Sequence, residues 1–277
     1  MTYRFIKKSG VSEILTPAFA LLDVEALQIQ FFMKDVSKRV FYAIFRLLSV
    51  IKTTSFSKLF ISVSYLLRSE GLYNRSKVQA FPDRKEMHRY LASQYISPDE
   101  KIHYMEFGVF WGQTYRIWVE GNRNPETKFV GFDTFTGLPE DWGSEKKGSY
   151  SADGKLPDIH DPRSEWQVGL IQDTLPHYVR KISSEERKVI HIDVDLYNAS
   201  LITLIHLQPY LRRGDIIIFD DFFTFTKTTH EFKAFCDFVE LFKTDYKPIF
   251  KCRYGHLVIE IEQFGTVRTA SSALPAA

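Results

Sequence analysis

From residue 85 onwards, short apolar runs alternate with stretches whose apolar residues recur at helical spacing. Seven runs predict strands, at residues 102–109, 128–135, 165–172, 189–196, 215–222, 246–253 and 256–261. Helices are expected at residues 112–123, 174–182, 198–214 and 229–244. Such alternation is typical of a parallel sheet covered by helices on both faces. The last two strands are separated only by a short turn around Tyr254 and Gly255, which permits an antiparallel pair and excludes a parallel one. The pattern predicts an α/β domain with a mostly parallel, seven-stranded sheet and an antiparallel last strand.

The first part of the chain has a different character. Residues 24–68 have apolar residues at mixed three- and four-residue spacing, and residues 1–90 carry a net charge of +8 against −6 for the remainder. The apolar runs are too short to span a bilayer. We favour a helical cap that packs on the main domain as a lid or as a contact in a homo-oligomer. The alternative is a basic amphipathic segment in peripheral contact with an anionic membrane surface.

These patterns divide the chain into three regions. We expect an N-terminal helical segment over residues 1–80, the α/β domain over residues 81–264, and a disordered tail over residues 265–277. The start of the chain does not resemble a signal peptide, and the two cysteines, Cys236 and Cys252, lie in apolar stretches. We therefore expect a reducing, cytoplasmic location. No nucleic-acid-binding motif accompanies the basic charge, so nucleic acid is not an expected partner.

Four carboxylates stand at the ends of two predicted strands. Asp193 and Asp195 follow one apolar run, and Asp220 and Asp221 follow the next. In open α/β sheets, ligands bind beyond the carboxyl ends of the strands. A cluster of unpaired carboxylates raises its own pKa values, and oxygen ligands suit Mg²⁺. If the strand continues as far as Asp195, alternation would put Asp193 and Asp195 on the same side. The competing interpretation is that these acids cap helices or form ion pairs with Arg212, Arg213 or Lys227.

A glycine turn lies at the end of the first of these strands. The run "YMEFGVFWGQT" contains Glu106, then Gly108, then Gly112 at the start of a helix, and the next strand ends at Asp133. The spacing differs from the GxGxxG of dinucleotide enzymes, and no phosphate-binding lysine follows. An acid in the position of Asp133 can accept hydrogen bonds from ribose hydroxyls. Together these features predict a site for S-adenosylmethionine, with contacts expected from Glu106, Phe107, Gly108, Gly112, Gln113, Thr114, Asp133, Thr134 and Phe135.

Several motifs in order resemble one known family. The runs "MEFGVFWGQT", "VGFDTFTGLPEDW", "VGLIQDTLP", "IDVDLYNAS" and "GDIIIFDDF" resemble the macrocin O-methyltransferase (TylF-like) family over about residues 85–260. The resemblance implies a Rossmann-like class I methyltransferase that acts on sugar hydroxyls of natural products. It implies metal ligands at Asp193, Asp220 and Asp221, and a catalytic base at Asp193, with Asp195 as our alternative base. Catechol-type relatives have a lysine where this chain has Leu196, which favours a carboxylate base.

The resulting hypothesis is an O-methyltransferase that depends on S-adenosylmethionine and Mg²⁺. Its acceptor would be a hydroxyl of a sugar or polyol, as a small molecule, a glycan or a glycolipid. Two alternatives stay open: a non-catalytic binding or scaffold protein that keeps the fold, and an NAD-dependent oxidoreductase, against which the glycine spacing argues.

Further residues carry weaker expectations. The long connection at residues 140–166 predicts a lid over the acceptor, with Trp142 and Tyr150 stacking on a sugar. Asp173 is expected to cap the helix that starts at Leu175, with a place near the adenine end of the cofactor as the alternative, and His191 is expected to be a satisfied core histidine. His230 and His256 lie within reach of the acids, but their spacing assigns neither one as a ligand.

Overall fold

The computed structural model describes residues 78–222, 230–252 and 255–264. The N-terminal helices and the C-terminal tail expected from the sequence lie outside these residues. Within the described ranges, no helix is both long enough and apolar enough to cross a membrane.

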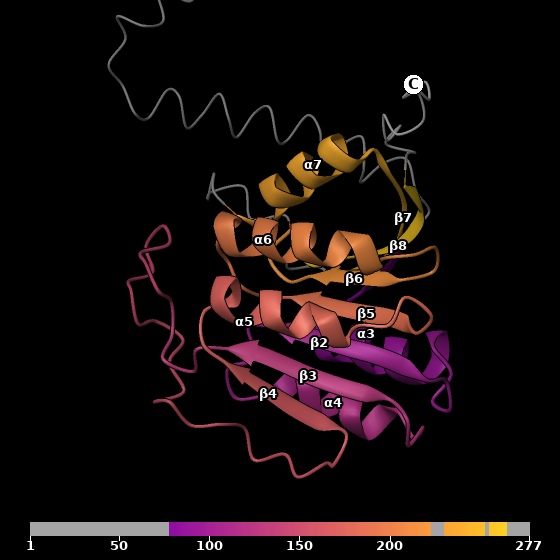
Figure 1. Ribbon diagram of the computed structural model, residues 1–277, viewed down its shortest axis with the longest axis horizontal. Helices are drawn as coiled ribbons and strands as arrows, with labels where there is room; N and C mark the ends of the chain where they lie inside the picture. The colour runs from indigo at the N-terminus through magenta and orange to yellow at the C-terminus, as the bar shows by residue number, and fades with distance from the viewer. Residues whose placement is uncertain (1–77, 223–229, 253–254, 265–277) are drawn as a thin grey trace, which may run out of the picture. The chain divides into compact units, whose positions relative to one another are not determined.

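One mixed sheet of eight strands organises the described residues (Figure 1). The strands are β1 (Gln79–Phe81), β2 (Ile102–Phe107), β3 (Lys128–Asp133), β4 (Ser164–Val168), β5 (Arg187–Ile192), β6 (Ile216–Phe219), β7 (Thr244–Cys252) and β8 (Leu257–Phe264). Their order across the sheet is β1-β7-β8-β6-β5-β2-β3-β4. Strand β8 pairs antiparallel with both β6 and β7, and all other neighbours are parallel. The predicted Rossmann-like architecture with its antiparallel last strand is confirmed.

Helices cover both faces of the sheet. The α-helices are α3 (Arg84–Tyr90), α4 (Gln113–Gly121), α5 (Ile171–Tyr178), α6 (Tyr197–Leu207) and α7 (Glu231–Phe242). Short π- and 3₁₀-helical turns extend three of them: η1 (Leu91–Tyr95), η2 (Val179–Lys181) and η3 (Gln208–Tyr210). Helices α5, α6 and α7 pack on one face, whereas α3 and α4 pack on the other (Figure 1).

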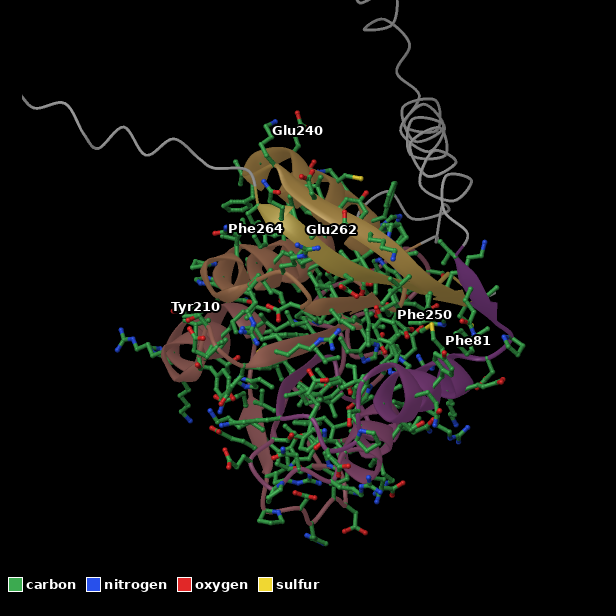
Figure 2. All side chains as sticks on the ribbon, turned by 90° about the vertical axis from the view of Figure 1, so that its right-hand side faces the viewer. Phe81, Tyr210, Glu240, Phe250, Glu262 and Phe264 are labelled. Atoms are coloured by element: carbon green, nitrogen blue, oxygen red, sulfur yellow. The ribbon has the colours of Figure 1, made fainter. Side chains whose placement is uncertain are left out.

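The predicted strand count of seven is wrong, because an eighth strand lies at the predicted boundary between the N-terminal segment and the α/β domain. Strand β1 has three residues, lies at the edge of the sheet and pairs with β7. Its Phe81 ring packs edge-on against Phe250, 5.7 Å between ring centroids (Figure 2). Three residues are too few to show a strand period, so only pairing with β7 reveals this element.

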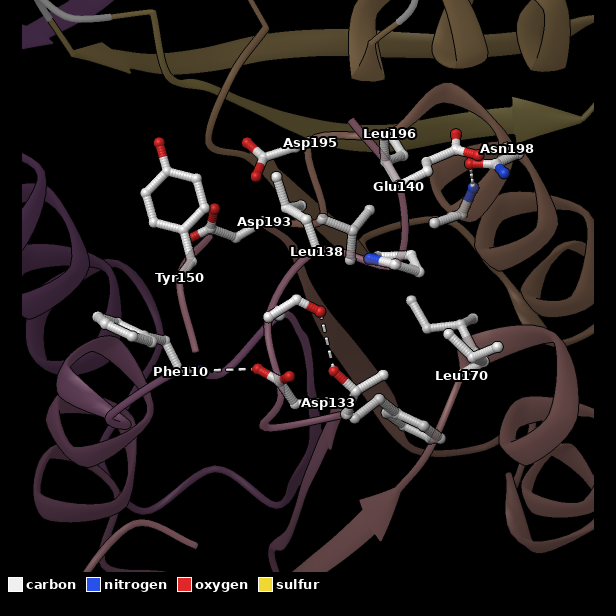
Figure 3. A pocket seen from close by; sticks show the side chains of 18 of the residues that line it. Phe110, Asp133, Leu138, Glu140, Tyr150, Leu170, Asp193, Asp195, Leu196 and Asn198 are labelled. Atoms are coloured by element: carbon white, nitrogen blue, oxygen red, sulfur yellow. Dashed lines mark hydrogen bonds between the residues drawn. The ribbon is translucent and has the colours of Figure 1, made fainter. Parts of the chain in front are cut away.

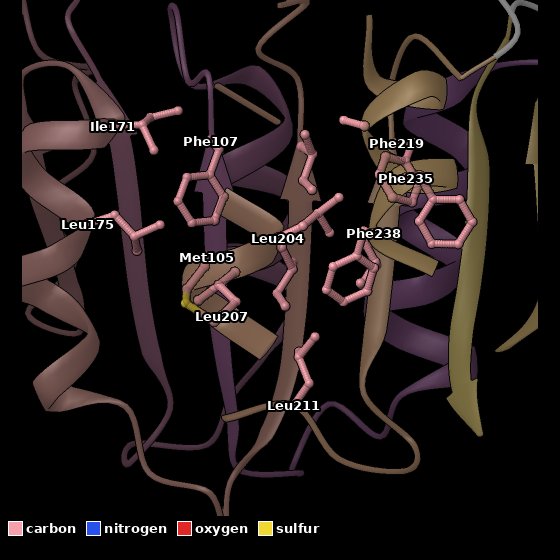
Figure 4. Close-up of a cluster of buried hydrophobic side chains, with 14 of the residues drawn as sticks. Met105, Phe107, Ile171, Leu175, Leu204, Leu207, Leu211, Phe219, Phe235 and Phe238 are labelled. Atoms are coloured by element: carbon pink, nitrogen blue, oxygen red, sulfur yellow. The ribbon is translucent and has the colours of Figure 1, made fainter. Parts of the chain in front are cut away.

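Aliphatic and aromatic side chains fill the space under α5, α6 and α7. Strand β2 is buried along its whole length, as a central strand covered on both faces must be. Figure 4 shows Phe107 between α5 and α6, and Phe219 beside Phe235 of α7. This packing holds the carboxyl ends of β2, β5 and β6 in fixed relative positions, which matters for the site described next.

Candidate functional site

Three backbone hydrogen bonds continue the sheet one residue past the strand ends. Gly108 N–H donates to Phe132 O (2.9 Å), and Asp193 N–H donates to Phe107 O (2.8 Å). Asp220 N–H donates to Ile192 O (3.0 Å). The predicted convergence of these strand ends at one edge is therefore observed. Gly108, Asp193 and Asp220 follow one another across neighbouring strands.

Gly108 is required by a close backbone approach. Its φ is +84°, and a Cβ atom there would lie 1.8 Å from the carbonyl oxygen of Asp193. No side chain fits at that distance, and the backbone on both sides is held by the sheet. The glycine thus lets the turn after β2 pass directly beside the first acid of the cluster.

Asp133 braces this turn. Its Oδ2 accepts hydrogen bonds from the N–H groups of Val109 and Phe110, each at 2.7 Å, and its Oδ1 accepts one from Phe135 N–H at 2.7 Å (Figure 3). The side chain is half-buried and lines the cavity. Each oxygen of a carboxylate has more than one lone-pair site, so these bonds leave capacity for a ligand hydroxyl.

A cavity of about 470 Å³ lies at this edge of the sheet. The sequence-predicted site residues that line it are Gly108, Asp133, Thr134, Asp193, Asp195, Asp220 and Asp221. Six other residues expected to contact the cofactor are absent from its lining: Glu106, Phe107, Gly112, Gln113, Thr114 and Phe135. Residues that sequence reasoning did not select also line it, including Arg84, Phe110, Leu170, Gln172 and Asn198.

Glu106 is fully buried beneath the cavity rather than at its surface. Its carboxylate accepts hydrogen bonds from the hydroxyl groups of Thr114 (2.6 Å) and Tyr104. The ring of His191 lies 3.6 Å away on the other side. In this position Glu106 links β2 to the start of α4.

Asp193 and Asp220 form the acidic floor of the cavity. Burial and the negative charge of Asp220 raise the pKa of Asp193 well above its usual value. Burial alone would also raise the pKa of Asp220, but the rings of His191 and His256 and the charge of Arg84 hold it well below its usual value. The His256 Nδ1 atom lies 3.0 Å from Asp220 Oδ1, so His256 does reach the site. His230 instead accepts a hydrogen bond from Phe232 N–H as the cap of α7.

His191 is buried in the core, as expected, but it also contacts acids of the site. It is fully buried between the carboxylates of Glu106 and Asp220, 3.6 Å from each. Burial opposes its charge, but these two acids outweigh burial and raise the pKa of His191 to about 10. A protonated ring at this position would offset part of the acidic charge.

Arg84 is the most important residue of the site that the sequence analysis did not select. Its guanidinium donates to both carboxylate oxygens of Asp220, at 2.9 and 3.1 Å, and lies 3.6 Å from Asp193. The predicted alternative partners do not make these contacts: Arg212 pairs with Asp215 instead, and Lys227 lies outside the described residues. A signal did exist, since Arg84 follows the helix cap Asp83, and a cation in a first helical turn opposes the helix dipole.

Glu231, the first residue of α7, is a second missed residue. It is fully buried, and its carboxylate accepts hydrogen bonds from Val194 N–H (3.1 Å) and Asp221 N–H (3.2 Å). Burial and the charges of Asp221 and Asp193 raise its pKa well above the usual value. Glu231 thus ties the loop after β5 to the loop after β6.

Asp195 is not on a strand. Strand β5 ends at Ile192, so the expectation that alternation aligns Asp195 with Asp193 does not hold. Asp195 has a φ of +62°, in the left-handed region that non-glycine residues rarely adopt. It lines the cavity beside Asp193 and Tyr150 (Figure 3).

The long connection between β3 and β4 forms one wall of the cavity. The two residues predicted to stack on a sugar lie in different environments. Tyr150 is exposed and lines the cavity, whereas Trp142 is buried against Leu138 and Leu196. The prediction that Trp142 stacks on a ligand is therefore wrong. Asp173 is not a cap either, because α5 begins at Ile171 with Leu170 as its cap residue.

The donor groups fit a divalent cation. Ligand atoms of His191, Asp193 and Asp220 lie within 4.8 Å of one another. Burial and the negative charge of Asp220 raise the pKa of Asp193, and a cation held by these two carboxylates would relieve the repulsion between them. The neighbouring half-buried Asp221 supplies further oxygens at the same edge.

Comparison with known proteins identifies a methyltransferase domain in this chain. Residues 105–222 match a family model described as a methyltransferase domain. Among solved structures, the chain is similar to CalS11, a calicheamicin methyltransferase, with 20% identity and a TM-score of 0.51 over 72% of this chain and 91% of that one. It is also similar to the O-methyltransferase NovP, with 20% identity and a TM-score of 0.50 over 65% and 80% of the two chains. No curated protein matches the sequence.

Residues 105–222 thus carry a methyltransferase domain, and the Rossmann-like fold around them is that of the class that uses S-adenosylmethionine. The expectation of an enzyme is confirmed at that level, and the oxidoreductase alternative is not supported.

Proposed function

We propose that this protein is an O-methyltransferase that uses S-adenosylmethionine and Mg²⁺ to methylate a sugar or polyol hydroxyl. One observation carries the proposal. A single cavity is bordered by the Gly108 turn, by Asp133, and by the Asp193–Asp220 pair. A cofactor with a ribose and a methyl donor would then lie beside the group that activates the acceptor.

The cofactor half of the cavity is the region around Gly108, Asp133 and Thr134. Asp133 would accept ribose hydroxyls through its remaining lone pairs, and Gly108 leaves the turn open to the methionine portion. Leu170 and Ile171 line the cavity beyond Asp133 and would pack against the adenine ring.

The acceptor half is the region around Tyr150 and the acids. Tyr150 and Phe110 are exposed aromatic residues in the cavity wall, and both have a left-handed backbone, with φ of +60° and +54°. Backbone strain of this kind is retained where it positions a functional side chain. Aromatic faces suit the apolar face of a sugar ring. The TylF-like subfamily and a natural-product, glycan or glycolipid acceptor remain part of this proposal.

The chemistry transfers one methyl group. Asp193 would accept the proton of the acceptor hydroxyl. The acceptor oxygen then forms a bond to the methyl carbon as the sulfur–carbon bond breaks, leaving S-adenosylhomocysteine. Asp195 is the alternative base. Asp193, Asp220 and Asp221 would hold Mg²⁺, which when bound lowers the pKa of a coordinated hydroxyl. The protein's remaining contribution is alignment of the two reactants.

The test begins with cofactor binding by the full chain. Calorimetric titration should give binding of S-adenosylhomocysteine and none of NAD. Asp133→Asn should weaken that binding about tenfold or more, because an amide nitrogen cannot accept the backbone N–H groups that order the turn. The matched control, Asp153→Asn, changes an exposed acid in the connection between β3 and β4 and should bind normally.

Transfer of a labelled methyl group to a panel of nucleotide sugars and glycolipids, with Mg²⁺ or with EDTA, then tests the acceptor and the metal. Failure to bind S-adenosylhomocysteine would overturn the proposal in favour of a non-catalytic protein that keeps the fold. Activity that persists in EDTA would remove the metal from it.

A further inference from the structure

Arg84 occupies the position from which a cation would neutralise the acidic pair. Its Nη1 atom lies 2.9 Å from Asp220 Oδ2, 3.1 Å from Asp220 Oδ1 and 3.6 Å from Asp193 Oδ2. The side chain of Asp220 is only 11% exposed, whereas that of Arg84 is 36% exposed and lines the cavity. The Asp220 carboxylate is thus held in place, whereas the Arg84 guanidinium is partly open to the cavity.

The position of residue 84 in helix α3 does not explain why it is an arginine. Arg84 is the first residue of α3, directly after the cap Asp83, where the helix dipole disfavours a positive charge. Its charge is compensated instead by acids that are 109 and 136 residues away in the sequence. Strand β1 precedes the helix and is held by its pairing with β7, so the start of α3 is anchored next to the site.

A guanidinium and a divalent cation need the same oxygens. Both oxygens of Asp220 contact Arg84, and the nearest oxygen of Asp193 faces it. A cation bound to both carboxylates would lie a few ångströms from the guanidinium, where like charges repel strongly in a partly buried site. The two occupants therefore exclude each other.

We propose that Arg84 is a resident counter-ion that competes with the divalent cation for Asp193 and Asp220, so that the metal binds only when the guanidinium swings toward the cavity opening. This inference rests on the proposed metal dependence of the function. Without metal, Arg84 stabilises the acidic cluster; with metal bound, Arg84 is released into the cavity. The affinity of the site for the cation is then set by the cost of breaking the Arg84 ion pairs.

Manganese titration of the full chain, followed by the electron paramagnetic resonance signal of free Mn²⁺, tests the competition directly. Arg84→Gln should bind Mn²⁺ about tenfold more tightly than wild type or better, because a repelling charge is removed from a partly buried site. Arg84→Lys, which keeps the charge but loses the two-oxygen contact, should lie between them. Arg89→Gln changes an exposed arginine on the same helix and should match wild type.

Thermal unfolding gives a second readout that does not depend on activity. Without metal, Arg84→Gln should melt below wild type, since Asp220 loses its ion pair. At saturating Mn²⁺ the difference in Tm should disappear, because the cation replaces the arginine in both proteins. A merely structural arginine would leave the same difference with and without metal.

Two results would overturn the competition, and they separate it from the proposed function. If Arg84→Gln binds Mn²⁺ no more tightly than wild type, while wild type does bind it, Arg84 is not a competitor and the metal site stands. If neither protein binds Mn²⁺ although both bind S-adenosylhomocysteine, the metal is removed from the proposed function and the competition with it. Should Arg84→Gln fail to fold, the Mn²⁺ affinity of Arg84→Lys decides, and equality with wild type refutes the inference.

Discussion

The two ends of the parallel strands both bury charged groups, but they do so in opposite ways. At the amino ends of β5 and β6, Lys188 and Asp215 are fully buried and lie 3.6 Å apart. Asp215 accepts hydrogen bonds from the N–H groups of Lys188 and Arg212, both at 2.8 Å. Lys188 Nζ donates to Glu186 O at 2.6 Å. Arg212 Nε also lies 4.0 Å from Asp215 Oδ1, so this single acid faces two cations, and backbone groups supply the remaining hydrogen bonds.

At the carboxyl ends of the same strands, acids crowd together. Asp193, Asp220 and Glu231 are close enough that the negative charges of its neighbours raise the pKa of Glu231 well above the usual value, in addition to burial. The compensating cations, Arg84 and His191, are shared among several carboxylates.

The backbone shows the same contrast. Among the described residues, six non-glycine positions have positive φ. Three of them, Phe110, Tyr150 and Asp195, line the cavity at the carboxyl ends of the strands. Two more, Phe135 and Asp153, belong to the loop that forms its wall. Backbone strain and crowded negative charge are therefore concentrated at one edge, which is where a ligand would relieve them.

The largest effect is expected from a substitution that removes the ion pair between Lys188 and Asp215 at the amino ends of the strands. Asp215→Ala should reduce the free energy of unfolding by about 3–5 kcal/mol, because it leaves Lys188 and two backbone N–H groups buried without partners. Urea denaturation measures this loss. Glu185→Ala, an exposed acid near the same edge, should change stability by about 0.5 kcal/mol or less. If folded Asp215→Ala no longer binds S-adenosylhomocysteine, this edge is not purely structural.

The corresponding substitution at the carboxyl ends of the strands should lower the rate of methyl transfer rather than the stability of the fold. Asp193→Asn should slow methyl transfer about 10³-fold, since it removes the proposed base. Its Tm should stay the same or rise, because the raised pKa means that ionised Asp193 costs folding free energy at neutral pH. Asp153→Asn serves as the control. A drop of several degrees in the Tm of Asp193→Asn would contradict the division between the two edges.

A smaller effect should appear at acidic pH through His103, at the amino end of β2. Burial lowers the pKa of His103 to about 4, and its Nε2 lies 2.9 Å from the Tyr178 hydroxyl. The folded state therefore disfavours protonation, so the contribution of His103 to stability is present above pH 6.5 and is lost as pH falls toward 4. The loss amounts to about 3 kcal/mol.

Urea denaturation of wild type and His103→Gln between pH 7 and pH 4 measures this contribution. The variant should lose less stability on acidification, whereas His177→Gln, at an exposed position, should follow wild type. Parallel pH profiles for wild type and His103→Gln would show that the ring does not titrate in this range.

Much of the fold follows from local patterns in the sequence. Runs such as "VIHI" and "DIIIF", separated by helical stretches, predicted the parallel strands, and the short final turn predicted the antiparallel β8. Gly108, Asp193 and Asp220 were also predictable as neighbours, because residues that follow adjacent parallel strands meet at one edge.

The sequence by itself thus determined the α/β class, the edge that carries the site, and the acids that define it, since each depends on residues close together in the chain. Tertiary structure decided which groups face those acids. Arg84 lies 136 residues from Asp220 in a segment without a clear pattern. Glu106 turned inward to Thr114 and His191, and Trp142 into a side cluster. A strand or helix period specifies which face a residue occupies, but which charges and rings meet there depends on how distant segments pack.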